Sequence, residues 1–221
     1  ANICYYCACN KVITKDRARA APYLQRLEQE IQLVACHLDG KQRVEQLHLG
    51  GGTPTFLSHV ELRQLMATLR QHFNLLDDDS GDYGIEIDPR EADWSTMGLL
   101  RELGFNRVSL GVQDLDPAVQ RAVNRLQSLE QTRTLIEAAR TLQFRSINLD
   151  LIYGLPRQTP EGFARTVEEV IRLQPDRLSV FNYAHLPERF MPQRRIEAGE
   201  LPSAAATLEM LHATIAQLTA A

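Results

Sequence analysis

The sequence predicts an α/β protein built on a parallel sheet, and two features indicate it. Stretches typical of strands alternate five times with amphipathic stretches typical of helices, without a linker or low-complexity segment between them. Polar and glycine-rich residues gather after the predicted strands, at the edge where parallel sheets carry their active sites. This alternation is typical of a barrel or of a doubly wound sheet, and periodicity does not choose between them.

The strands are predicted from short runs of alternating or continuous apolar residues. They cover residues 44–49, 83–87, 107–112, 146–152 and 177–181. Three glycines end the first strand, and Asp88-Pro89 closes the second, because glycine and proline interrupt regular strands.

The helices between the strands are predicted from apolar residues spaced three and four apart and from capping chemistry. They cover residues 17–36, 59–69, 95–103, 117–123, 129–142, 160–173 and 203–221. Ser58 with Glu61 forms a capping box, and Ser128 caps a later helix. Pro160 suits a first helical turn, and Gly104 suits the left-handed position after a helix.

Length and composition fit one globular domain with a full core. The chain has 221 residues, 44% of them hydrophobic and 24% charged. A net charge of −4 gives no electrostatic footprint for nucleic acid or a membrane surface. No apolar run reaches membrane-spanning length, and the N-terminus lacks the order of a signal peptide. Three of the four cysteines are clustered, which suits a reducing compartment, so we expect a cytoplasmic protein.

The most informative segment is CYYCACNK at residues 4–11, with three thiols in six positions. Cys4 and Cys7 form a Cys-x2-Cys pair, which suits a soft metal or an iron–sulfur cluster. The alternatives are a zinc knuckle, a thioredoxin-like redox pair and a disulfide. A zinc knuckle needs a second ligand pair, but Cys36 is isolated and the six histidines lack metal-site spacing. A cluster with three cysteine ligands would need one more thiol upstream of Ala1.

This segment resembles the Cys-x3-Cys-x2-Cys cluster loop of radical S-adenosylmethionine (SAM) enzymes, with the first cysteine immediately before Ala1. Cys9 and the Asn-Lys that follows it resemble the oxygen-independent coproporphyrinogen III oxidase (coproporphyrinogen dehydrogenase) family in particular. The resemblance covers essentially the whole chain through further motifs. These are GGGTPT at 50–55, EIDPRE at 86–91, GVQD at 111–114, NLDLIYGLP at 148–156 and FNYAHLP at 181–187.

The resemblance implies a partial, open (β/α)6 barrel of parallel strands, whose first strand precedes Ala1. Residues 1–221 would form a single catalytic barrel domain, truncated at its N-terminus and without the family's C-terminal domain. The chain is therefore expected to be part of a longer protein.

The resemblance also implies a [4Fe-4S] cluster and two SAM molecules. Cys4 and Cys7 match two of the three cluster ligands, whereas Cys9 falls outside the ligand positions. The residues expected to line the SAM sites are Tyr6, Gly51, Gly52, Thr53, Glu86, Gln113, Arg125, Asp150 and Ala184. The glycines and the threonine would contact the methionine part, Arg125 a carboxylate and Ala184 the adenine, and the acids and the amide would take the ribose hydroxyls and the amine. No catalytic residue is assigned.

Some of these residues also have structural explanations. The glycine loop could be a tight turn, and Glu86 could form an ion pair with Arg90. Three further residues are expected to be structural: His48 and His185 as hydrogen-bonded core residues, and Trp94 as part of the apolar core.

The function that the resemblance implies is the oxidative decarboxylation of two propionate side chains of coproporphyrinogen III to vinyl groups, which gives protoporphyrinogen IX in haem biosynthesis. The reduced cluster would pass an electron to SAM, and the resulting 5′-deoxyadenosyl radical would take a hydrogen atom from the substrate. The electron donor would be a reductase such as flavodoxin, and the protein a monomer. Arg189, Arg194 and Arg195 could contact propionates but are expected to be solvated.

Two other functions stay open. The first is a haem chaperone that shares the barrel but normally lacks the extension from Cys7 to Lys11. The second is a non-enzymatic barrel in which Cys4, Cys7 and Cys9 hold zinc.

Overall fold

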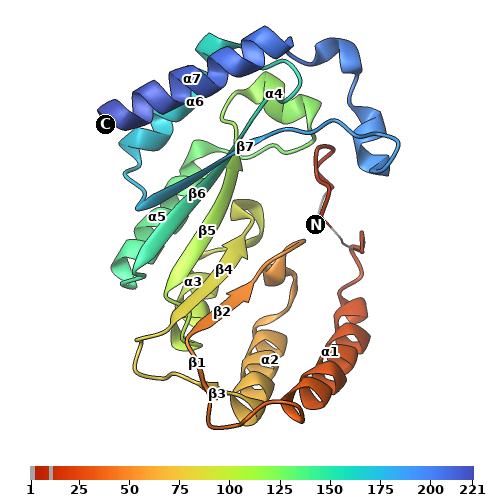
Figure 1. The fold of residues 1–221 in the computed structure, drawn as a ribbon, viewed down its shortest axis with the longest axis vertical. Coiled ribbons are helices and arrows are strands. Elements are labelled where there is room, and N and C mark those ends of the chain that lie inside the picture. The colour runs from red at the N-terminus through yellow and green to blue at the C-terminus, as the bar shows by residue number, and fades with distance from the viewer. Residues whose placement is uncertain (1–2, 10–11) are drawn as a thin grey trace.

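The computed structural model of the chain, which describes residues 3–9 and 12–221, is built on a five-stranded parallel sheet. Its strands are β2 (Gln46–Leu49), β4 (Asp82–Ile87), β5 (Arg107–Gln113), β6 (Ser146–Tyr153) and β7 (Arg177–Asn182). Neighbours in the sheet follow the order of the chain, as Figure 1 shows, whereas a doubly wound sheet reverses its order at a switch point. Among the described strands β2 and β7 are the two edges, so the predicted open barrel is confirmed.

Seven α-helices accompany the sheet in the described part of the chain. They are α1 (Ala20–Ala35), α2 (His59–His72), α3 (Trp94–Glu102), α4 (Pro117–Ala122), α5 (Leu129–Thr141), α6 (Pro160–Arg172) and α7 (Ala204–Ala220). In Figure 1, α6 and α7 lie on the β7 side of the sheet, and α1 and α2 lie on the β2 side. Ser58 and Ser128 each complete a capping box, and Gly104 follows α3 with a φ of 99°, so these predictions are confirmed.

The first predicted strand differs from the expectation. Residues 44–49 are divided at Glu45 into β1 (Arg43–Val44) and β2, and β1 pairs with β3 (Asn74–Leu75) in a separate two-stranded sheet. Strand β3 lacks a periodic pattern because it has only two residues. The assignment of Trp94 to the core is also wrong. Trp94 is the first residue of α3, directly after the Asp93 cap, and it is 45% exposed.

The register of the strands gives the sheet one apolar and one polar face, because cross-strand partners point to the same side. The apolar face packs against helices α3 and α5 and forms the main core. Its central residues are Tyr83, Ile85, Ile87, Val108, Leu110, Ile147, Leu149 and Leu151. The opposite face, turned away from these helices, carries Glu86, Ser109, Asn148, Asp150 and Ser179. The interior of the open barrel is therefore polar.

Among the described residues, none of the helices combines the length and the apolar character that a membrane crossing requires.

Leu149 tests the apolar face, because it lies fully buried at the centre of the sheet, on β6. We expect Leu149→Ala to lower the free energy of unfolding by about 2–5 kcal/mol through lost burial and the cavity left behind. Urea denaturation of the full-length protein measures this. The matched control is Leu33→Ala on the exposed side of α1, which should change the free energy by less than about 0.5 kcal/mol. Equal effects at both positions would contradict the assignment of the core.

Candidate active site

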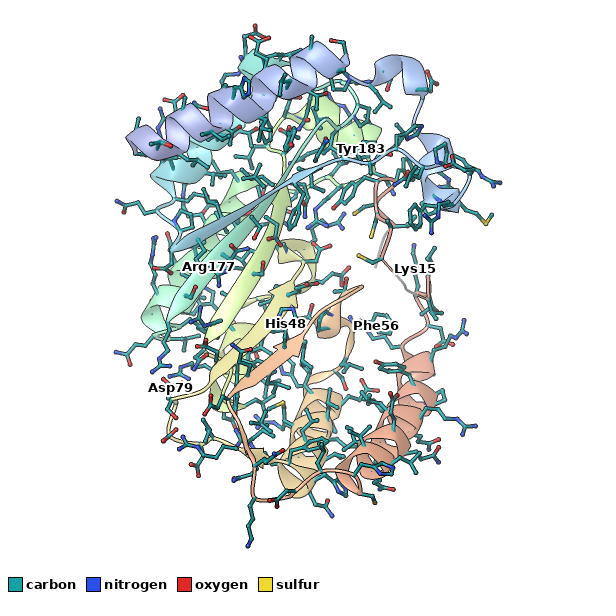
Figure 2. The ribbon with its side chains drawn as sticks, viewed as in Figure 1. Lys15, His48, Phe56, Asp79, Arg177 and Tyr183 are labelled. Carbon is teal, nitrogen blue, oxygen red and sulfur yellow. The ribbon has the colours of Figure 1, made fainter. Side chains whose placement is uncertain are left out.

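The cysteine segment lies against the end of α4, beyond the carboxyl ends of the strands. The Tyr5 amide donates to the Val123 carbonyl over 2.9 Å, and Asn124 Nδ2 donates to the Ile3 carbonyl over 2.8 Å. The rings of Tyr5 and Tyr6 pack on a buried apolar cluster around Val119, Val123, Leu155 and Ile196. Figure 2 shows Tyr183, at the end of β7, beside this segment. The segment is thus held by residues that follow β5 and β7.

Cys4 lies in a cationic environment. The residue is only 7% exposed, and its Sγ accepts from Arg90 Nη2 at 3.4 Å and from Arg125 Nη1 at 3.5 Å. Asp88 joins the two arginines, because its Oδ2 lies 2.6 Å from Arg90 Nη2 and 3.0 Å from Arg125 Nη1. The sulfur of Cys4 thus accepts hydrogen bonds from two guanidinium groups, and second contacts of this kind are common around metal-binding side chains.

The charges of this group support one another. Burial works against an ionised Asp88, but the hydrogen bond from Arg90 and the charges of both arginines outweigh it and hold the pKa of Asp88 below its usual range. Burial would lower the pKa of Arg125, but Tyr6, Asp88 and Cys4 together raise it. Asp88 and both guanidinium groups are therefore charged at neutral pH.

Tyr6 lies between the two cysteines and stays protonated. Burial raises its pKa well above 10, and the nearby Cys4 and Cys7 raise it further against the opposing effect of Arg125. Its backbone carbonyl accepts from Gln193 Nε2, which also donates to the carbonyl of Ala184. The structure thus connects two residues that were predicted separately.

Arg125 and Gln113 lie over Gly111, where β5 has an irregular register. A Cβ at Gly111 would come within 2.7 Å of Gln113 Nε2 and 3.0 Å of Arg125 Nη2. Arg125 Nη2 donates to the Gly111 carbonyl over 2.6 Å, whereas the buried Nε has no hydrogen-bond partner among the described residues. Gln113 has a φ of 69°, which directs the chain out of the strand at the register shift. A buried donor without a partner points to a missing acceptor.

Buried Asp114 anchors the loop that carries Gln113. Its carboxylate accepts from the Asp116 amide at 2.7 Å, Thr166 Oγ1 at 2.8 Å and Gln158 Nε2 at 2.5 Å. Gln158 Nε2 also donates to the Ile152 carbonyl, so the loops after β5 and β6 are joined beneath the site.

Glu86 lies at the end of β4, beside the glycine loop. Its Oε2 accepts from the Gly51 amide over 2.9 Å, and its Oε1 lies 3.4 Å from His48 Nε2. The alternative that paired Glu86 with Arg90 is wrong, because Arg90 is held by Asp88. His48 lies exposed on β2 (Figure 2), so its expected place as a core residue is also wrong. His48 instead lies beside the site, where its Nε2 contacts Glu86.

The glycine loop has an open side. Gly51 and Gly52 have φ values of 70° and 62°, in the left-handed region that favours glycine. A Cβ at Gly51 would meet nothing within 4 Å, so its surface is open to a ligand. Thr53 follows in extended conformation and leads into the short 3-10 helix η2 (Pro54–Phe56).

Asp150 belongs to a polar network on the inner face of the sheet. Its carboxylate accepts from Ser109 Oγ at 2.9 Å and from Asn148 Nδ2 at 2.7 Å. Ser179 Oγ in turn donates to Asn148 Oδ1 over 3.2 Å. Burial raises the pKa of Asp150, the two hydrogen bonds oppose this, and the charge of Glu86 raises it further. Glu86 and Asp150 therefore share one electrostatic environment.

The comparison with known families agrees with this geometry: the family model described as the radical SAM superfamily matches residues 1–170. The chain belongs to the radical SAM superfamily.

The radical SAM chain is also similar to individual proteins. It is 77% identical over 221 residues to an oxygen-independent coproporphyrinogen III oxidase of Pseudomonas aeruginosa, covering 100% of the chain and 48% of the relative. It is 50% identical over 217 residues to the enzyme of that name from Escherichia coli, covering 98% of the chain and 47% of the relative. The chain thus spans about half the length of the curated relatives it matches.

Solved structures give the same picture. Coproporphyrinogen III oxidase (HemN) from Escherichia coli, described as a radical SAM enzyme, matches with a TM-score of 0.95 and 49% identity over 99% of the chain and 50% of its own. The methyltransferase TsrM from Kitasatospora setae, described with cobalamin and a [4Fe-4S] cluster bound, matches with a TM-score of 0.54 and 16% identity over 71% of the chain and 30% of its own. The second match shows the fold alone.

The described residues fit a radical SAM site in two respects. The Cys4 thiol lies between two guanidinium groups, and the unpartnered Arg125 Nε together with the open Gly51 surface leaves room and a donor for an anionic ligand. The described residues contain no group of three His, Cys, Asp or Glu side chains placed to hold a metal. The assignment of Cys4 and Cys7 as cluster ligands stays a prediction.

The structure groups the predicted residues in two clusters. Cys4, Tyr6, Gln113 and Arg125 lie together, with Ala184 joined through Gln193, and Glu86 contacts Gly51 and acts electrostatically on Asp150. Gly52 and Thr53 adjoin Gly51 in the chain. Sequence reasoning missed two kinds of residue, the ion pairs of Asp88 and the buried amide of Gln193. The position of Asp88 directly after a strand was a usable signal, whereas Gln193 offered none.

The pH dependence of folding tests the buried carboxyl of Asp114. Burial raises its pKa despite hydrogen bonds from Asp116, Gln158 and Thr166, so the folded protein binds this proton more tightly than the unfolded chain. The contribution of this proton to the free energy of unfolding is therefore complete below about pH 4 and is lost as the pH rises through the folded-state pKa. We expect Asp114→Asn to remove this decline, measured by urea unfolding of the full-length protein from pH 3 to 7.

The control for Asp114 is Asp82→Asn, at a partly exposed ion pair with Arg107. This variant should keep the decline in the free energy of unfolding. Parallel pH profiles of the wild type and Asp114→Asn would show that the wild-type decline has another origin.

Proposed function

We propose that the chain is the cofactor-binding barrel of an oxygen-independent coproporphyrinogen III oxidase. The reaction is the oxidative decarboxylation of two propionate side chains of coproporphyrinogen III to vinyl groups, which gives protoporphyrinogen IX in haem biosynthesis. The similarity supports it, since the chain is 77% identical to an enzyme of that name over its whole length. The observation that carries the proposal is the buried Cys4 thiol between Arg90 and Arg125, with the Arg125 Nε left for an acceptor.

The [4Fe-4S] cluster is assigned to Cys4 and Cys7, together with a ligand outside the described residues. Two SAM molecules are assigned to the remaining predicted residues. Arg125 suits a carboxylate, since a guanidinium binds carboxylates in two-point geometry and its Nε is unpartnered. Gly51, Gly52 and Thr53 suit the methionine part, and Ala184 suits the adenine. Glu86, Gln113 and Asp150 suit hydroxyl and amine groups, and Tyr6 lines the site between the two cysteines.

When bound, the cluster and SAM would supply the redox chemistry, which is the removal of a hydrogen atom from each reacting propionate. The chain itself would bind the cofactors and orient the side chains that contact them. Arg90, Arg125 and Asp88 hold Cys4, and the Ser109 and Asn148 side chains hold the carboxylate of Asp150 by hydrogen bonds. Each reacting propionate would then lose carbon dioxide and one electron and become a vinyl group. The electron would pass to an acceptor.

The wider setting belongs to the same proposal. Residues 1–221 form one barrel domain of a monomeric cytoplasmic enzyme, and a reductase such as flavodoxin supplies the electron. The large share of each relative that lies outside the matched region supports a longer native chain.

The proposed function is tested with the full-length protein after anaerobic reconstitution of iron and sulfide. We expect a cluster, SAM cleavage to 5′-deoxyadenosine, and a coproporphyrinogen III product lighter by two carbon dioxide molecules and four hydrogen atoms. Cys4→Ala should abolish all three, because it removes a cluster thiolate. The control is Cys36→Ala, an exposed cysteine at the end of α1, which should leave all three unchanged.

Two outcomes would overturn this function. SAM cleavage without loss of carbon dioxide, accompanied by haem binding, would indicate the haem chaperone. Stoichiometric zinc without iron or sulfide would indicate the zinc-binding barrel.

Arg125 offers a separate test of the SAM site. Arg125→Lys keeps the charge but removes Nε and the planar geometry, so we expect SAM affinity to fall roughly 10- to 100-fold. Isothermal titration of the reconstituted protein with SAM measures this. Arg121→Lys, an exposed change on α4, is the matched control and should bind as the wild type does. An unchanged dissociation constant for Arg125→Lys would remove Arg125 from the SAM site.

A further inference from the structure

We propose that Gln193 is a positioning residue that fixes the cysteine segment against the segment carrying Ala184. This inference rests on the proposed function, because it concerns two segments assigned to the cluster and SAM. Gln193 lies in the short 3-10 helix η4 (Met191–Arg195) after β7, and it is 1% exposed. Gln193 would act on the site through the backbone of two predicted residues, because it donates to the carbonyls of Tyr6 and Ala184.

The contacts of Gln193 use the full donor capacity of its amide. Nε2 donates to the Tyr6 carbonyl over 3.0 Å and to the Ala184 carbonyl over 3.1 Å. Oε1 accepts from the Leu186 amide over 2.6 Å. One side chain thereby satisfies three backbone groups from two loops, and Tyr6 and Gln193 are 187 residues apart in the sequence.

The arrangement requires the chemistry of an amide. A carboxylate of the same shape has no donor, so Glu at this position would place an anion against two carbonyl oxygens. An apolar side chain of similar size would leave all three backbone groups without their partner in a buried place. Glutamine supplies two donors and an acceptor at one point, which is what the three backbone groups need.

Neighbouring contacts strengthen the same connection. The Arg195 guanidinium lies 5.2 Å from the centre of the Tyr5 ring, and Ile196 belongs to the buried cluster on which Tyr5 and Tyr6 pack. The segment after β7 therefore contacts the cysteine segment through Gln193, Arg195 and Ile196, among others. Gln193 is the one of these three for which a bond to Ala184 is also present.

The consequence is a fixed spacing between the cluster ligands and the adenine side of the SAM site. Tyr6 stands between Cys4 and Cys7, so movement of its carbonyl moves the ligand turn, in which the Cys7 amide donates to the Cys4 carbonyl. Small displacements matter in such sites because catalysis and cofactor binding depend on preorganised geometry. Gln193 would hold that geometry before SAM binds.

The test compares Gln193→Glu and Gln193→Leu with a partly buried glutamine as the control, in the full-length protein. The control is Gln217→Leu on α7, whose Nε2 donates to the Ala164 carbonyl in α6, away from the site. We expect both Gln193 variants to keep the iron content but to bind SAM roughly tenfold or more weakly, because buried hydrogen bonds are lost. The electron paramagnetic resonance spectrum of the reduced, SAM-bound cluster should change in both variants and stay as in the wild type in the control.

Hydrogen–deuterium exchange before cluster loading gives a reading that is independent of activity. We expect Gln193→Glu to increase exchange in peptides covering residues 3–9 and 183–187, and to leave the peptides of β4, β5 and β6 unchanged. A uniform increase over the whole protein would indicate general destabilisation and overturn the positioning role. The positioning role would also be overturned if the Gln193 variants had the exchange, the SAM affinity and the spectrum of the wild type.

The two proposals fail in different ways. A wild-type protein that takes up no cluster or SAM overturns the proposed function. A wild-type protein that loads both, with a Gln193→Glu variant whose SAM affinity, exchange and spectrum equal those of the wild type, overturns the inference about Gln193 alone.

Discussion

The site depends on one buried group of charges, in which Asp88 holds Arg90 and Arg125 against the thiol of Cys4. Burying two arginines is costly unless each is paired, and the carboxylate between them offsets this cost for both. These residues come from the N-terminal segment, from the end of β4 and from the end of α4. The ion pairs therefore do more than place one cysteine, because they bring three distant parts of the chain to one point before any cofactor is present.

The polar inner face of the sheet explains how an open barrel can present so many polar groups. In a closed barrel of eight strands, bulky apolar side chains fill the interior. Here the apolar side of the sheet packs on α3 and α5, and the inner side carries Ser109, Asn148 and Asp150 in one hydrogen-bonded network. The alternation of apolar and polar residues along β6 is unusual for a parallel strand, which is commonly apolar on both sides. In β6, Asn148 and Asp150 lie on the inner face, whereas Leu149 and Leu151 lie on the face that packs in the core.

The sequence predicted the elements well because their signals are local. Strands β4 to β7 and the capping boxes at Ser58 and Ser128 follow from residues within a few positions of each other. The failures have a common cause in tertiary context. Trp94 was assigned to the core from its type, but it lies exposed at the start of α3, directly after the Asp93 cap. Glu86 was matched with Arg90 by closeness in the chain, whereas the carboxylate of Asp88 reaches Arg90 first. The strand split at Glu45 follows from pairing with β3, in which Val44 is the partner of Leu75, 31 residues further along the chain. No local pattern encodes this pairing.

The candidate site shows the same limit more sharply. Residues such as Gly51, Glu86 and Asp150 were predicted because they belong to motifs that resemble those of a known family, in or just after the predicted strands. Their supports were not, because a buried glutamine that bonds three backbone groups has no periodicity, no motif and no charge. Gln158, which donates to Asp114 beneath Gln113, is of the same kind. These amides and carboxylates lie outside the apolar pattern that drives folding, yet each is buried and bonded to loops from different strands. A buried polar group without a hydrogen-bond partner is costly. These side chains and the backbone groups that they contact can therefore be buried only when the loops adopt a single arrangement. The precision of the site thus rests on long-range hydrogen bonds that become visible only once the chain is folded.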